Sequence, residues 1–108
     1  MKVSYRQTAS DDLVRQFRYY LLAADVPEIA VRFREAARRT IQSLREHPLV
    51  GPRYSSSNPQ LHNLRSWPVA GFEAIRIYYL VDEDVIHIIR ILHSKRDVKR
   101  ILENEETD

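Results

Sequence analysis

The strongest pattern in the chain lies between Phe72 and His93, where Ile, Val and Tyr dominate two successive runs. These residues favour a pleated strand, whereas the acidic run 82–84 between them consists of residues that strands disfavour. The pattern therefore predicts a β-hairpin whose arms pair antiparallel around an acidic turn. With that turn, Val81 is expected opposite Val85, and the rest of the register follows.

The two faces of this hairpin are expected to differ, because side chains alternate across a strand. One face is almost entirely apolar and suits a core. The other face mixes apolar side chains with Arg76 and Arg90, which this register places directly across from each other. Two facing arginines repel each other unless an anion lies between them, and the apolar residues around them form a patch that favours burial. We therefore expect a partner to cover this face, although a single strand arginine is more simply solvent-exposed.

Two helices are predicted before the hairpin from apolar residues at helical spacing. The first begins near Thr8 and carries Leu13 and Phe17 on one side. The second begins at Pro27, since helices tolerate proline in their first turn, and ends before Pro48. The two helices are expected to form a helical hairpin with one apolar side. The polar side of the second helix is rich in arginine, which we interpret as a solvated face.

The remaining segments complete a single α+β domain that spans the whole chain. Residues 2–6 are expected to form a short strand, residues 48–63 a loop, and residues 64–69 a strand ahead of the hairpin. Ser94 is expected to cap a last helix, which an acidic, frayed tail at 103–108 follows. The predicted order is β-α-α-β-β-β-α, with the helical hairpin packed against a small antiparallel sheet.

The charge of the chain is unevenly distributed. Of its 108 residues, 17 are basic and 15 acidic, a net charge of +2. Four of the acids lie in the last six positions, so the first 102 residues carry 17 basic and 11 acidic residues, a net charge of +6. A basic body favours an acidic partner, either nucleic acid or an acidic protein segment. The sequence has no apolar run that could cross a bilayer and no signal peptide, so we expect a soluble intracellular protein.

Few residues form a pattern that indicates catalysis. The chain has no cysteine, and its four histidines are scattered without the spacing of a metal site. There is no phosphate-binding loop and no serine nucleophile motif. We therefore predict neither a metal nor a cofactor. Lys95 and Arg96 differ from the other basic residues, because no packing or capping role explains them.

Four short motifs follow one another in the second half of the chain. They are residues 64–69 (LRSWPV), 71–73 (GFE), 77–79 (IYY) and 89–93 (IRILH), and the last leads to Arg96-Asp97. Together they resemble the ParE toxins of bacterial type II toxin-antitoxin modules, within the wider ParE/RelE superfamily. The resemblance extends over nearly the whole chain.

This resemblance implies a toxin that a cognate antitoxin neutralises in the bacterial cytoplasm, in a hetero-oligomeric complex. The acidic or amphipathic C-terminal segment of the antitoxin would lie along the sheet, in agreement with the covered face of the hairpin. ParE-like relatives inhibit DNA gyrase, arrest growth and stabilise plasmids, so the expected activity is inhibition of a topoisomerase and not catalysis. The residues expected to bind the antitoxin are Arg76, Tyr78, Leu80, Ile86, Ile88, Arg90 and Leu92. Those expected to contact the target are Lys95, Arg96, Lys99 and Arg100.

RelE-like relatives instead cleave mRNA on the ribosome, and this alternative stays open. It would use basic residues on and after the strands, for which the chain offers Arg65, Arg76 and Arg96. The last helix has Ile101 and Leu102 where this resemblance leads us to expect a tyrosine, so a general acid or base is missing. A third possibility is a protein that binds an antitoxin without being toxic.

Overall fold

The sheet of the computed structural model, which describes residues 1–106, has four strands in the order β1-β4-β3-β2. They are β1 (Lys2–Tyr5), β2 (Arg65–Val69), β3 (Phe72–Asp82) and β4 (Val85–His93). The predicted α+β class and the order β-α-α-β-β-β-α are confirmed. The sheet is mixed and not antiparallel throughout, because β1 runs parallel to β4 while the other pairs are antiparallel. A parallel pair needs a long crossover, and here two helices followed by β2 and β3 connect β1 to β4.

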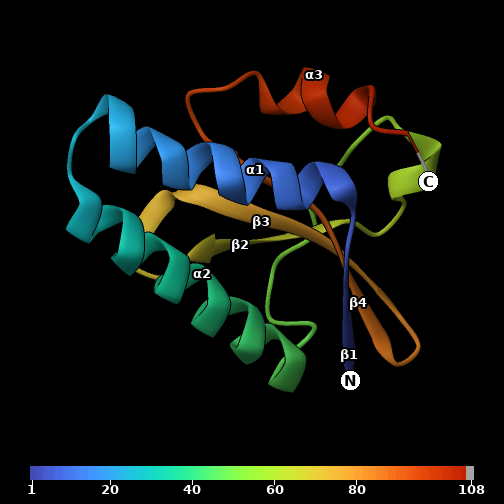
Figure 1. Ribbon diagram of the computed structural model, residues 1–108. Helices are drawn as coiled ribbons and strands as arrows, with labels where there is room; N and C mark the ends of the chain where they lie inside the picture. The colour runs from blue at the N-terminus through green and yellow to red at the C-terminus, as the bar shows by residue number, and fades with distance from the viewer. Residues whose placement is uncertain (107–108) are drawn as a thin grey trace.

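Both crossover helices, α1 (Gln7–Arg18) and α2 (Pro27–Glu46), lie on the same face of the sheet (Figure 1). A π-helical turn, η1 (Tyr19–Ala23), continues α1 towards the connection with α2. The third helix is α3 (Val98–Glu103), and a 3₁₀ turn, η2 (Pro59–Leu61), lies in the loop before β2. Within residues 1–106, no helix combines the length and the apolar character that crossing a membrane requires.

The ends of the helices agree only in part with the sequence pattern. Pro27 occupies the first turn of α2, and the helix ends at Glu46, as predicted. The residue before α1 is Arg6, so Thr8 lies inside the first helical turn and its hydroxyl is free to reach other elements. Asp97, and not Ser94, caps α3, because its side chain accepts a hydrogen bond from the backbone N–H of Arg100.

The turn of the β3-β4 hairpin is shorter than predicted. Asp82 pairs with Val85, so the turn consists of residues 83–84 alone. Glu83 adopts a φ of 51°, the left-handed conformation that a two-residue hairpin turn requires. Val81 consequently lies opposite Ile86 and not opposite Val85.

A bulge in β4 changes the register a second time. The pairing skips Ile89, so Arg90 lies opposite Tyr78 and Arg76 lies opposite Leu92. The prediction that Arg76 and Arg90 face each other directly is therefore wrong. Counting alternate residues along the sequence cannot detect one extra residue in a strand. That residue nevertheless moves every later side chain to the opposite face.

The first core lies between the sheet and the helices α1 and α2. Phe33, Ala37 and Ile41 of α2 pack there against strand residues. Ile86 and Ile88 belong to this core and are fully buried. These two residues therefore lie on the face opposite to the one predicted for them.

The second face of the sheet has a core of its own, which the sequence pattern did not predict. Buried leucines from the loop before β2 and from α3 pack on buried residues of β3 and β4. These residues are Leu61, Leu64, Leu102, Tyr78, Ile89 and Leu92. The chain itself covers the central part of the face that we expected a partner to cover.

The outer edge of β2 is closed by two local features. The segment 52–54 runs along it, with Ser66 N–H donating to the Pro52 carbonyl at 3.1 Å and Tyr54 N–H donating to the Leu64 carbonyl at 2.8 Å. Farther along the strand stands Pro68, which has no N–H to offer.

Candidate functional site

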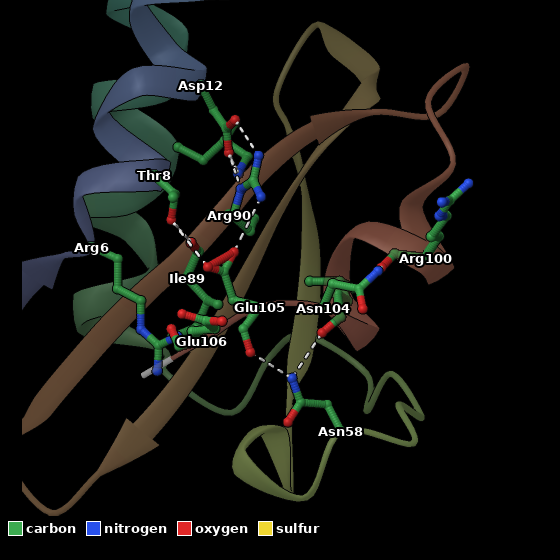
Figure 2. Close-up of polar contacts among 12 residues, drawn as sticks. Arg6, Thr8, Asp12, Asn58, Ile89, Arg90, Arg100, Asn104, Glu105 and Glu106 are labelled. Carbon is green, nitrogen blue, oxygen red and sulfur yellow. Dashed lines mark hydrogen bonds and ion pairs between the residues drawn. The ribbon is translucent and has the colours of Figure 1, made fainter. Parts of the chain in front are cut away.

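A buried carboxylate on α1, Asp12, binds an arginine of β4 in a two-pronged ion pair (Figure 2). Arg90 Nε lies 2.8 Å from Asp12 Oδ2, and Arg90 Nη2 lies 2.8 Å from Asp12 Oδ1. The backbone N–H of Ile91 also donates to Oδ2, at 2.9 Å. The Asp12 side chain is 1% exposed, so this carboxylate holds α1 against the part of β4 that extends beyond β1.

A second carboxylate, from the C-terminal tail, reaches the same arginine. Arg90 Nη1 donates to Glu105 Oε1 at 3.1 Å, and the hydroxyl of Thr8 donates to Glu105 Oε2 at 3.3 Å. The Glu105 side chain is 6% exposed. We name Thr8, Asp12, Arg90 and Glu105 the Asp12 cluster.

The tail that carries Glu105 is docked, which corrects the prediction of a frayed end. Asn58 Nδ2 donates to the carbonyls of Leu102 and Glu105, at 3.0 and 2.8 Å. Arg6 Nη1 donates to the carbonyl of Glu106 at 2.9 Å. Through Glu105 the tail supplies the second acid for a nearly buried guanidinium. Residues 107–108 lie outside the described residues.

The electrostatics of the Asp12 cluster are those of an internal structural contact. The hydrogen bonds that Arg90 donates to Asp12 raise the pKa of Arg90, against the effect of burial, and Glu105 adds to the rise. The arginine therefore stays charged, and each of its three nitrogens binds a carboxylate. Arg90 is neutralised from within the chain, so it lacks the unpaired charge that would attract an antitoxin.

An open apolar groove of about 740 Å³ runs between α1 and α2. We name it the helical groove. Val14 is 54% exposed in it and Leu22 is 71% exposed. The groove is lined by Tyr5, Ser10, Leu13, Val14, Phe17, Arg18, Leu21, Leu22, Phe33, Arg34, Ala37, Arg38 and Ile41.

The charged residues that line the helical groove are all basic. They are Arg18, Arg34 and Arg38, and the Arg34 guanidinium lies 5.5 Å from the centre of the Phe17 ring. Glu35 reaches Arg38 at 3.1 Å, in a pair exposed to solvent. A groove with an apolar floor and a basic rim suits an amphipathic segment with acidic residues at its edges.

The three arginines proposed for mRNA cleavage are not gathered in one site. Arg65 lies opposite Tyr79, on the face that α1 and α2 cover, and its Nη1 donates to the carbonyls of Leu49 and Gly51. Arg76 lies on the other face, where its Nε and Nη2 donate to the hydroxyl of Ser66. Side chains on opposite faces of a sheet cannot act on one phosphate.

The residues predicted to contact the target lie around α3. Lys95, Arg96, Lys99 and Arg100 are all exposed. Arg96 Nη1 comes within 3.9 Å of Asp12 Oδ1, at the edge of the Asp12 cluster. Their role in target contact stays a prediction.

The assignment of hairpin residues to the antitoxin also stays a prediction, but two of its grounds are wrong. Arg76 and Arg90 do not face each other, and Ile86 and Ile88 lie under the helices. The sequence pattern does not predict the helical groove, because the residues of its floor lie on the apolar side of the helices, which is expected to pack against the sheet. The available signal was Val14 and Leu22. These two apolar residues directly follow Leu13 and Leu21 of the apolar side of the first helix, and they lie about two helical turns apart.

Comparison with known proteins gives one family and one fold. The profile of the family described as the ParE toxin of the type II toxin-antitoxin system parDE matches residues 3–98. Among solved structures, the chain is similar to one described as the chromosomal ParDE TA system from P. aeruginosa, with 20% identity and a TM-score of 0.66. That similarity covers 86% of this chain and 95% of the other. A search of curated proteins found no match.

Proposed function

The chain belongs to the ParE toxin family of type II toxin-antitoxin systems, and from this we propose that it is a toxin whose cognate antitoxin lays an amphipathic segment in the helical groove. The observation that carries the proposal is the groove itself, with exposed Val14 and Leu22. Grooves that accept an amphipathic helix bury its apolar face and leave its polar face wet. The complex would be a hetero-oligomer.

The charge of the groove indicates which segment fits it. The rim is formed by arginines, and the chain without its last six residues carries a net charge of +6. An acidic amphipathic segment, such as we expect at the C-terminus of an antitoxin, complements both features. These features support a docking site on the helices and not on the hairpin face, because the chain's own second core covers the central part of that face.

For the cellular target we propose DNA gyrase, with inhibition of replication and growth arrest as the outcome. The support is membership of the ParE family, which is an argument by analogy. The RelE-like alternative has less support, because Arg65 and Arg76 lie on opposite faces of the sheet and Arg65 is bound to backbone carbonyls. Expression of the chain should therefore arrest growth, with loss of DNA supercoiling activity and without new cleavage ends in mRNA.

Titration with the cognate antitoxin tests the helical groove. The double variant Val14→Asp with Leu22→Asp should bind at least about tenfold more weakly, because it puts two charges into an apolar contact, a loss of about 1.4 kcal/mol or more. The matched control is Val31→Asp, on α2 but outside the groove lining and 45% exposed. Equal affinity of the double variant and the control would contradict the proposed docking site.

Two assays on the wild-type protein test the target. A supercoiling assay with purified gyrase should show inhibition that the antitoxin relieves. Primer extension on mRNA from arrested cells should show no ribosome-dependent cleavage. The opposite pair of results would replace gyrase inhibition with mRNA cleavage.

A further inference from the structure

Two apolar side chains face solvent on the segment that leads from the end of α2 to the edge of β2. Leu49 is 64% exposed and Val50 is 44% exposed. We name this pair the loop tip. Neither residue lines the helical groove.

The backbone under the loop tip is held by a tyrosine of the central strand. The hydroxyl of Tyr79, whose side chain lies in the first core, donates to the carbonyl of Pro48 at 2.8 Å and accepts from the N–H of Gly51 at 3.0 Å. Burial raises the pKa of Tyr79 above its ordinary value of 10.0, so the hydroxyl keeps its proton and can donate. One side chain thus fixes the residues on both sides of the tip.

Arg65 of β2 fixes the same backbone from a second direction. Its Nη1 donates to the carbonyls of Leu49 and Gly51, at 3.2 and 2.8 Å. Gly51 is buried so closely that a Cβ there would lie 2.6 Å from the Ser66 carbonyl oxygen and 2.6 Å from the Tyr79 hydroxyl. The loop is pressed onto the sheet, and its glycine allows that approach.

From this geometry we infer that the loop tip is a contact surface for the toxin's target, a folded protein that offers an apolar pocket with an acidic edge. The inference rests on the proposed toxin function. A loop fixed at its backbone loses little conformational entropy when it binds, so two aliphatic side chains on it can act as anchors of an interface.

The position of the tip favours the target over the antitoxin, and its charge indicates the character of the partner's rim. The α2 residues of the helical groove end at Ile41, whereas the tip follows the end of α2 at Glu46. A segment seated in the groove therefore need not touch it. Two exposed arginines, Arg45 and Arg53, flank the tip against the one acid Glu46, which favours an acidic rim on the partner.

The experiment compares growth arrest with antitoxin affinity for the double variant Leu49→Asp with Val50→Asp. We expect at least a tenfold rise in the amount of protein needed to arrest growth, with affinity for the cognate antitoxin unchanged within twofold. Val31→Asp is the control, and it should leave both values as in the wild type. Circular dichroism shows, independently of antitoxin binding, that each variant is folded.

A second variant tests whether the fixed backbone matters. Tyr79→Phe keeps Leu49 and Val50 but removes the hydroxyl that binds Pro48 and Gly51. We expect a several-fold loss of growth arrest, smaller than that of the double variant, again with unchanged antitoxin affinity.

Four outcomes separate this inference from the proposed function. Growth arrest by the double variant at wild-type levels would overturn only the inference that the loop tip contacts the target. A parallel loss of antitoxin affinity would assign the tip to the antitoxin and also overturn it. A wild type that arrests growth without inhibiting gyrase would overturn only the proposal that gyrase is the target. Growth arrest by the variants would still test the proposed role of the loop tip. A wild type that does not arrest growth would overturn both.

Discussion

The Asp12 cluster and the helical groove lie on two sides of α1, and they differ in their exposure to solvent. In the cluster, charged side chains from a helix, a strand and the tail meet one another and leave little to water. In the groove, apolar side chains of two helices line an opening that no described part of the chain fills. On one side of α1, Arg90 of the sheet serves the fold, while on the other side apolar residues of the helices are available to a partner.

The reason is the cost of burying a charge. An arginine on a strand between packed layers loses its hydration, so the chain must supply its own acids or lose stability. Asp12 and Glu105 meet that demand for Arg90. An exposed valine or leucine costs much less, so the helical groove can stay open until a partner arrives.

The largest effect is expected from removing the central acid of the cluster. Asp12→Ala leaves Arg90 with one carboxylate and the N–H of Ile91 without its acceptor, and should lower the free energy of unfolding by about 3–5 kcal/mol. Urea denaturation followed by circular dichroism measures this. The neighbouring Asp11→Ala is the control, because Asp11 is exposed; a similar loss in both variants would break the comparison.

An intermediate effect is expected from the acid of the tail. Glu105→Gln keeps the shape of the side chain but replaces a charged partner of Arg90, and should cost about 1–2 kcal/mol of unfolding free energy. Asp12 still neutralises Arg90, which is why the loss is smaller than for Asp12→Ala. Glu103→Gln, at an exposed position of α3, should cost less than about 0.5 kcal/mol in the same denaturation series. Equal values for the two variants would mean that the docked tail adds no stability.

The smallest effect on stability is expected from the helical groove. Val14→Asp with Leu22→Asp should change the free energy of unfolding by no more than about 1 kcal/mol, since both side chains are already largely in water. The same variant is the one expected to lose antitoxin affinity. A loss of stability as large as that of Asp12→Ala would show that the groove residues belong to the core.

The order of the elements could be predicted because the spacing of apolar residues and the positions of prolines and turn residues are local properties of a sequence. The run at 72–93 predicted the hairpin, and Pro48, just after the end of α2, predicted where that helix stops. The register of the β3-β4 pair could not be predicted. The skipped residue Ile89 interrupts the alternation of side chains in β4 without any change of residue type. The faces of Ile86 and Ile88 are reversed by the shorter turn alone, because both residues lie between the turn and the skipped residue.

The candidate site was harder to predict, because its contacts join distant parts of the chain. Asp12 and Arg90 are separated by 78 positions, and no local sequence pattern around either residue predicts their contact. The acidic tail predicts a frayed end, since four acids in six positions are typical of solvated termini. The groove residues were identified as apolar helix positions, but spacing along a helix does not reveal how far a neighbouring helix stands from it.

The closed edge of β2 has a consequence for the protein when no antitoxin is present. A strand with free backbone donors is a template on which further copies can stack into aggregates. Here the segment 52–54 occupies part of that edge, and Pro68 offers no donor in the rest. A molecule without its antitoxin should therefore not recruit further copies along β2.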